Sequence, residues 1–216
     1  MQIFKFRGKM QVESNILTPQ IRVVVLDLDG TLYAKSRMVW RMLSAAPKDW
    51  RRMLAERKTR KKMRGTWLQS EEMFYHTYFQ TMATYCNDTP ENLRLWYVNC
   101  YMPMMVSVIR KYYKPVDWLN NFASLCKTKG LKMVVLSDYG HTHEKLEALG
   151  IDEAIFDWVV SAPELGGLKP APQLLYKVTE YMEVTPDQCL VIGDRNDTDG
   201  ALAQAVGASF RLIKNS

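Results

Sequence analysis

Short apolar runs alternate with amphipathic segments along most of this 216-residue chain. The runs are rich in Val, Ile and Leu, which is typical of strands buried on both faces of a parallel sheet. Between the runs, apolar residues recur every three to four positions, as they do in helices that pack on a sheet. The pattern predicts strands at 23–26, 132–136, 156–161, 189–192 and 209–213, and helices at 115–129, 143–149, 170–182 and about 198–206.

Strands that alternate with helices favour right-handed βαβ crossovers and a parallel sheet. We therefore expect an α/β fold with a Rossmann-like, three-layer core. Residues 33–113 break the alternation, because their apolar residues recur at helical spacing and no strand-like run interrupts them. This predicts a core domain at 1–32 and 114–216 with an all-helical insertion at 33–113. Residues 1–20 carry no clear period and are expected to form an arm or an edge element.

Composition indicates a protein that is neither exported nor embedded in a membrane. No apolar run reaches the roughly 18 residues that a membrane span needs, and Lys5, Arg7 and Lys9 interrupt the apolar residues of the N-terminus. A cytoplasmic location with reduced thiols is the expectation. Four cysteines are scattered without CxxC spacing: Cys86, Cys100, Cys126 and Cys189.

The net charge of +6 comes from one segment. Residues 34–66 contain twelve Lys or Arg against Asp49 and Glu56, a net of +10, so the rest of the chain sums to −4. This basic stretch is either the solvated face of an amphipathic helix or a surface that attracts an anionic substrate. A nucleic-acid partner is less favoured, because no known nucleic-acid module accompanies the stretch. Oligomeric state stays open.

The first strand leads into two carboxylates and a glycine turn, Asp27-Leu28-Asp29-Gly30-Thr31. Carboxylates this close repel each other, so neither is cheaply buried without a cation or hydrogen bonds. A hard divalent ion such as Mg²⁺ prefers oxygen ligands of this kind. The alternative is an Asp-Gly turn that only caps a strand.

Three later segments also place polar residues at the ends of predicted elements. Ser137 ends the second strand and precedes Asp138, although a strand that ends in a polar turn has the same appearance. Lys169 follows Gly166-Gly167 and precedes Pro170, which predicts a lysine at a proline-started helix entrance. Asp194 and Asp199 follow the fourth strand, where a helix cap or a calcium-type loop is the alternative.

These four segments, in this order, resemble the four motifs of the haloacid dehalogenase-like superfamily, in its phosphatase branch with a C1 helical cap. DLDGT matches the first motif, Ser137 the second, the Lys169-Pro170 pair the third and GDRNDTD the fourth. The resemblance implies that residues 33–113 form a cap over the active site. Asp138 departs from the Asn that is more usual there, so its side chain either points away from a phosphate, binds a cation or is protonated.

The resemblance also implies the role of each residue. Asp27 would be the nucleophile that forms an aspartyl-phosphate, and Asp29 the general acid and base. Lys169 would neutralise the phosphate and the clustered aspartates. The phosphate would be bound by Thr31, Ser137, Asp138 and Lys169, and Mg²⁺ by Asp27, Asp29 (through its main-chain carbonyl), Asp194 and Asp199.

An aspartate at position 29 resembles the phosphohydrolase branch, because a halide leaving group needs no proton. The expected function is Mg²⁺-dependent hydrolysis of a small phosphorylated metabolite. A phosphomutase resembling β-phosphoglucomutase and a non-catalytic protein that binds polyanions or a partner are the alternatives. A phosphonate hydrolase is less favoured, since it needs a Schiff-base lysine in the cap. His76, His141 and His143 are expected to be surface histidines.

Overall fold

The computed structural model of the protein describes residues 16–215. Most of the arm or edge element predicted at 1–20 therefore lies outside the described residues. Five parallel strands form one sheet with the order β3-β2-β1-β4-β5. They are β1 (Val23–Leu26), β2 (Lys132–Ser137), β3 (Trp158–Ser161), β4 (Cys189–Gly193) and β5 (Ser209–Leu212). All five predicted strands are confirmed, to within two residues at each end.

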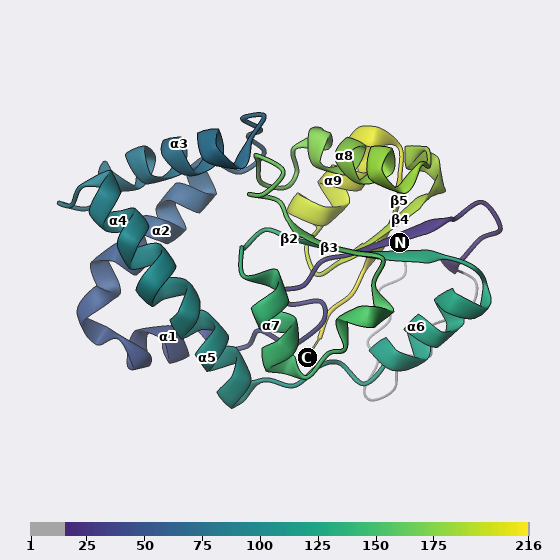
Figure 1. Ribbon diagram of the computed structural model, residues 1–216, viewed down its shortest axis with the longest axis horizontal. Helices are drawn as coiled ribbons and strands as arrows, with labels where there is room; N and C mark the ends of the chain where they lie inside the picture. The colour runs from purple at the N-terminus through teal and green to yellow at the C-terminus, as the bar shows by residue number, and fades with distance from the viewer. Residues whose placement is uncertain (1–15, 216) are drawn as a thin grey trace.

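Helices cover both faces of the sheet, so the predicted three-layer α/β core is confirmed (Figure 1). On one face lie α8 (Pro172–Met182) and α9 (Ala201–Val206), and on the other α6 (Leu119–Thr128) and α7 (Thr142–Leu149). Alternate residues of β1 enter two separate hydrophobic clusters, Val23 and Val25 on the α8 side and Val24 and Leu26 on the α6 side. This alternation follows from the two-residue repeat of a strand.

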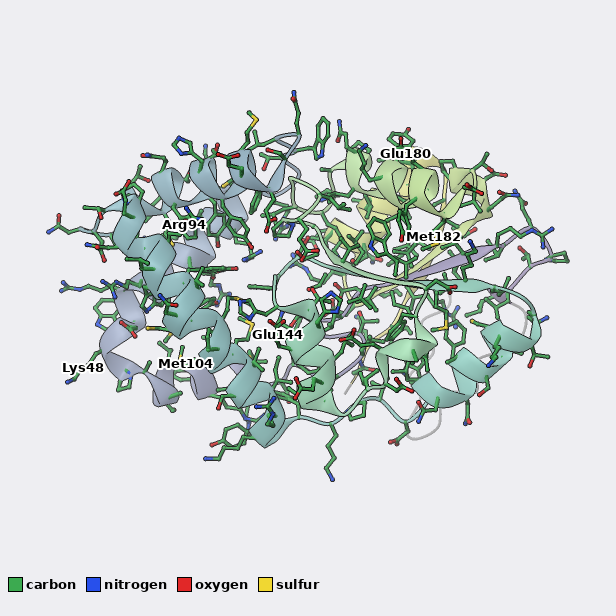
Figure 2. All side chains as sticks on the ribbon, viewed as in Figure 1. Lys48, Arg94, Met104, Glu144, Glu180 and Met182 are labelled. Carbon is green, nitrogen blue, oxygen red and sulfur yellow. The ribbon has the colours of Figure 1, made fainter. Side chains whose placement is uncertain are left out.

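Helix α8 shows how one helix separates apolar from charged residues. Its buried residues recur at helical spacing, and Figure 2 shows Met182 and Glu180 on different sides of the helix. Met182 is 4% exposed in the core, whereas Glu180 faces solvent. The hydrophobic face of α8 therefore fixes the helix on the sheet.

Residues 38–112 form five helices that lie beside the sheet rather than on its faces (Figure 1). They are α1 (Met38–Ala45), α2 (Trp50–Lys62), α3 (Glu71–Ala83), α4 (Pro90–Trp96) and α5 (Met102–Tyr112), with a π-helical turn at Tyr97–Tyr101. Of the apolar residues that recur at helical spacing in this segment, some are buried and others are exposed: Phe74, Tyr78, Met105, Val108 and Ile109 are buried, and Val39, Met73 and Tyr112 are exposed. The structure agrees with the prediction that this segment is helical. The prediction that the segment forms a domain separate from the core stays a prediction.

These five helices are joined to the sheet core by the chain on either side of them, and they also contact the core elsewhere. The loop after α2 runs beside the loop that precedes Lys169. The Leu68 amide donates to the Gly166 carbonyl over 2.7 Å, and the Leu168 amide to the Thr66 carbonyl over 3.0 Å. The Trp67 indole N–H donates to the Leu165 carbonyl over 2.9 Å. The loop that carries Lys169 is therefore held partly by residues outside the sheet core.

Two predicted helix starts are wrong, and each error has a local cause. The helix after Lys169 begins at Pro172 and not at Pro170, because residues 168–171 form a turn closed by the Ala171 amide on the Leu168 carbonyl. The Lys169-Pro170 peptide is cis. The helix predicted from 115 begins at Leu119, since the Val116 amide pairs with the Leu32 carbonyl beside the first strand.

The helix predicted at about 198–206 is divided in two. Residues Asn196–Gly200 form a wide π-helical turn, and the α-helix itself covers Ala201–Val206. The wide turn brings Asp199 back toward the end of β4. Across residues 16–215, no helix combines the length and apolar character needed to cross a bilayer.

Candidate active site

The carboxyl ends of three neighbouring strands bring the predicted site residues together. Asp27 and Asp29 follow β1, Ser137 ends β2 and Asp194 follows β4. β1 lies between β2 and β4, so the crossovers leave it in opposite directions. In open parallel sheets such a switch point leaves a crevice beyond the strand ends, where ligands bind.

Asp27 is the centre of a buried hydrogen-bonded group. The Lys169 ammonium donates to Asp27 Oδ1 over 2.6 Å and to Asp199 Oδ1 over 2.6 Å, and the Thr31 hydroxyl donates to Asp27 Oδ2 over 2.9 Å. Asp27 is 6% exposed, and Lys169 and Asp199 are almost fully buried. Four residues predicted from three separate segments therefore meet in one place.

The charges of this group are only partly balanced. Burial raises the pKa of Asp27 to about 7; Lys169 opposes this increase, and repulsion from Asp199 and Asp29 adds to it. Burial works against the charge of Lys169, but Asp199 and Asp27 outweigh it and hold the lysine pKa well above its usual value. The site therefore retains excess negative charge that a further cation would stabilise.

A set of carboxylates close to this group fits a divalent metal. Asp27, Asp194 and Asp199 each offer an oxygen within 4.8 Å of the others. Glycines allow this close approach, because an added Cβ at Gly193 would overlap the Asp199 carboxyl and one at Gly30 would overlap the Asp194 carboxyl. Oxygen ligands of this kind suit a hard ion such as Mg²⁺.

The Lys35 ammonium also contacts oxygens that are predicted to bind the metal. Its ammonium lies 2.6 Å from the Asp29 main-chain oxygen and 2.7 Å from Asp194 Oδ2. Both oxygens are predicted metal ligands, so a positive group already lies against two members of the set. Nothing in the sequence motifs pointed to Lys35.

The Asp29 carboxylate is held by three donors, of which the sequence predicted only one as part of the site. The Tyr33 hydroxyl donates over 2.6 Å, the Ser137 hydroxyl over 3.0 Å and the Lys145 ammonium over 3.0 Å. Burial disfavours the charged form of Asp29, but Lys145, Tyr33 and Lys35 outweigh it and lower the pKa of the carboxyl. The Asp29 carboxylate is therefore ionised, and three hydrogen bonds hold it in place.

Lys145 has an identifiable sequence signal. The buried residues of α7 are Thr142, Lys145, Leu146 and Leu149, so the lysine occupies the apolar stripe of the helix. A charged residue in that stripe is unusual unless it is paired. Burial lowers the pKa of Lys145, while the contact with Asp29 raises it.

Asp138 contacts the loop that carries Lys169, and its predicted position relative to a phosphate stays a prediction. Its Oδ1 accepts the Lys169 amide hydrogen over 2.9 Å, so the carboxylate stabilises the loop that carries the catalytic lysine candidate. The histidines are peripheral. His76 is exposed, His143 lies 2.8 Å from Glu153, and His141 lies 3.4 Å from Glu144.

Arg60 connects helix α2 to the strand-end loop. Its guanidinium donates to the Asp138 carbonyl over 2.6 Å and lies 3.7 Å from the ring centroid of Tyr139. Glu56, 2% exposed, accepts from Arg60 over 3.0 Å and from the hydroxyls of Tyr78 and Tyr101. One member of the basic stretch is thus a structural residue and not part of a solvated face.

Replacing Lys145 with Met should leave Asp29 buried without its charged partner. Removing one member of such a pair costs about 3–5 kcal/mol at pH 7. In the wild type the lowered pKa of Asp29 gives stability that is present above its usual value of 3.8 and is lost as pH falls. In the variant, Lys145 no longer opposes the effect of burial, so the pKa of Asp29 should be higher than in the wild type. Ionising the buried Asp29 carboxyl should then destabilise the variant protein as pH rises. Urea unfolding in chelator should show a large deficit at pH 7 and a small one near pH 4.

Lys177→Met is the matched control, because Lys177 is half exposed and pairs with Glu180 on the surface. It should change the unfolding free energy little at either pH. An equal deficit for Lys145→Met at both pH values would contradict the assigned contact with Asp29.

A family model described as haloacid dehalogenase-like hydrolase matches residues 21–207. The chain therefore belongs to the haloacid dehalogenase-like hydrolases, as its four motifs predicted. The fold and the strand-end site described above agree with this assignment.

Three similar proteins extend this result. Protein SUPPRESSOR OF QUENCHING 1, chloroplastic, of Arabidopsis thaliana is 35% identical over 110 residues, which is 48% of this chain and only 10% of that protein. Phosphoglycolate phosphatase of Aquifex aeolicus is 24% identical over 194 residues, 89% of this chain and 84% of that protein. The crystal structure of a predicted phosphoglycolate phosphatase from Haemophilus somnus 129pt matches with a TM-score of 0.59 and 16% identity, over 89% of this chain and 85% of that one. This last likeness shows the fold alone.

Proposed function

We propose that this protein is a Mg²⁺-dependent phosphatase that hydrolyses a small phosphomonoester, and that helices α1–α5 act as the cap of its active site. The observation that carries the proposal is the position of Lys169, 2.6 Å from both Asp27 and Asp199 at the strand ends. An ammonium there neutralises charge on a transferring phosphoryl group, which is the main demand of this chemistry. Membership of a hydrolase family and a relative named as a phosphatase support the proposal.

The proposed reaction has two steps. An Asp27 oxygen attacks phosphorus, the bond from phosphorus to the leaving oxygen breaks, and Asp29 gives that oxygen its proton. A water oxygen then attacks phosphorus while Asp29 takes the water proton. The bond from phosphorus to Asp27 breaks, which releases phosphate and restores the carboxylate.

Asp29 has to change its protonation state during this cycle. The three donors around it favour the ionised form, which is the form that activates water in the second step. A phosphoryl group placed beside Asp29 brings negative charge, and negative charge raises the pKa of a neighbouring carboxyl. Substrate binding would thus prepare the protonated form that the first step needs.

Asp27, Asp194 and the main-chain oxygen of Asp29 would hold Mg²⁺, with Asp199 supporting them. When bound, the ion neutralises charge on the phosphoryl group. The Lys35 ammonium now lies against two of these oxygens, so it would have to leave them. That movement would free Lys35 to approach an anionic substrate.

Metal removal should abolish activity. We expect hydrolysis of 4-nitrophenyl phosphate to need added Mg²⁺ and to stop in excess chelator, because the carboxylates then carry uncompensated charge. Mg²⁺ alone should also raise the melting temperature, since a ligand that binds the folded state stabilises it. Asp194→Asn should lose most of that increase. Full activity in chelator would contradict the proposal.

Product analysis separates the proposed phosphatase from the two alternatives. A phosphatase releases one inorganic phosphate for each alcohol formed, whereas a phosphomutase retains the phosphoryl group on its product. A non-catalytic protein would bind polyanions tightly and show no turnover with Mg²⁺. Stoichiometric release of phosphate is the expected result.

A further inference from the structure

A single cavity of about 1100 Å³ contains the strand-end site and extends along helices α1 and α2. Ligand pockets typically measure about 300–1,000 Å³, so this space exceeds the needs of a phosphate with a few carbons. Its far wall is formed by α1 and α2 and not by the sheet core. The groups on that wall should therefore contact the part of the substrate that is not transferred.

Basic side chains of α2 line this wall. Arg57 and Lys61 lie one helical turn apart on α2, and both line the cavity. Within residues 16–215 neither forms an ion pair, whereas Arg60 is paired with Glu56 and Arg64 with Asp197. Two exposed cations without partners inside a cavity offer a binding place for a second anionic group.

Large apolar side chains of α1 and α2 line the same wall. Trp40 is 73% exposed, Trp50 is 50% exposed and Leu54 is 45% exposed. Trp50, Leu54, Arg57 and Lys61 recur at the spacing of one helical face, and all line the cavity. Exposed indoles that line a cavity are a favourable surface for stacking a flat apolar group.

Other lysines of α2 show that this arrangement is not general to the basic stretch. Lys58 and Lys62 are also exposed on the same helix, but they lie outside the cavity. Lys48 projects from the outer edge of the helical layer (Figure 2). Some residues of the basic stretch thus face solvent, and others line the cavity of the site.

We infer that the substrate is a phosphomonoester that carries a second anionic group and a flat apolar group, such as an aromatic ring. Arg57 and Lys61 bind the second anion, and Trp40 and Trp50 contact the ring. This inference rests on the proposed phosphatase function and adds the substrate class. Small phosphates that lack both groups leave most of the cavity wall without contacts.

Four probes separate the two features. Adenosine 3′,5′-bisphosphate has both, AMP has the ring alone, fructose 1,6-bisphosphate has the second anion alone and ribose 5-phosphate has neither. We expect kcat/KM to be highest for adenosine 3′,5′-bisphosphate and lowest for ribose 5-phosphate. Each feature should contribute about tenfold, which is the size of one charge-assisted hydrogen bond or one stacked ring. Equal kcat/KM for all four probes, or a preference for ribose 5-phosphate, would overturn the inference.

Paired variants test the assigned residues. The double variant Arg57→Ala and Lys61→Ala should reduce the preference for adenosine 3′,5′-bisphosphate over AMP by about tenfold, mainly through KM. Lys58→Ala with Lys62→Ala removes the same charge outside the cavity and should keep the preference. Trp50→Ala should reduce the preference for AMP over ribose 5-phosphate, whereas Leu95→Ala, an exposed apolar residue of α4, should not. Equal loss in the control variants would overturn the assignment.

Binding measured without turnover separates failure of this inference from failure of the proposed function. In the Asp27→Asn protein, adenosine 3′,5′-bisphosphate should quench tryptophan fluorescence at a lower concentration than ribose 5-phosphate needs. If no probe is hydrolysed but this order of binding holds, the phosphatase proposal fails and the binding site stands. If probes are hydrolysed and bind alike, the substrate class is wrong.

Discussion

Asp27→Asn should reduce phosphatase activity by at least about 10⁴-fold, because an amide cannot attack phosphorus and loss of a nucleophile is among the largest single effects in enzymes. The stability of the folded protein should not decrease. Burial raises the pKa of Asp27 to about 7 in the metal-free site. A group whose pKa is raised on folding destabilises the protein as pH rises, so removing its charge should leave stability at pH 8 unchanged or higher.

The measurement is hydrolysis of 4-nitrophenyl phosphate with Mg²⁺, together with thermal unfolding in chelator at pH 8. Asp187→Asn is the control, because Asp187 is an exposed carboxylate just before the start of β4, at the end of that strand opposite to the site. It should keep both activity and stability. Activity of Asp27→Asn close to that of Asp187→Asn would contradict the role of Asp27.

Lys169→Met should combine a large loss of activity with a loss of stability. The lysine holds Asp27 and Asp199, and all three side chains are buried. Without it, two carboxylates face each other unpaired, at a cost of about 3–5 kcal/mol in chelator at neutral pH. The transferring phosphoryl group also loses a positive neighbour, which typically reduces kcat about 10²–10³-fold.

Mg²⁺ provides a second measurement on this variant. Because the carboxylates of Lys169→Met carry more uncompensated charge, the ion should raise the melting temperature of the variant more than that of the wild type. A purely structural lysine would give no such difference. An equal rise in both proteins would show that Lys169 does not share charge with the metal site.

Strands β1, β2 and β4 could be predicted because four apolar residues in a row leave few alternatives in a chain of this size, whereas the runs of the edge strands β3 and β5 are shorter and interrupted by polar residues. Helix ends were less predictable, since they depend on contacts outside the helix. Val116 pairs with Leu32, and this contact delays α6 until Leu119. The turn at 168–171 delays α8 until Pro172. The local sequence predicts neither the Val116–Leu32 contact nor the turn.

The predicted site residues came from motifs at strand ends, and those residues do meet. The missed residues, Tyr33, Lys35 and Lys145, lie just after a motif or on a helix, where lysine is usually a surface residue. Only Lys145 had a signal, its place in the apolar stripe of α7. The division of the basic stretch between solvent and cavity depends on which face of α2 is turned to the core, and the sequence leaves that undetermined.

The most direct test of the proposed function is detection of the aspartyl-phosphate at Asp27. In Asp29→Asn with 4-nitrophenyl phosphate, the leaving group needs no proton, but water activation in the second step is lost. The phosphoryl enzyme should therefore accumulate, with a burst of one nitrophenolate per protein. After acid quench and borohydride reduction, peptide mass spectrometry should find homoserine at position 27. A label at another residue, or a burst of equal size when Asp27→Asn is added to this variant, would contradict the account.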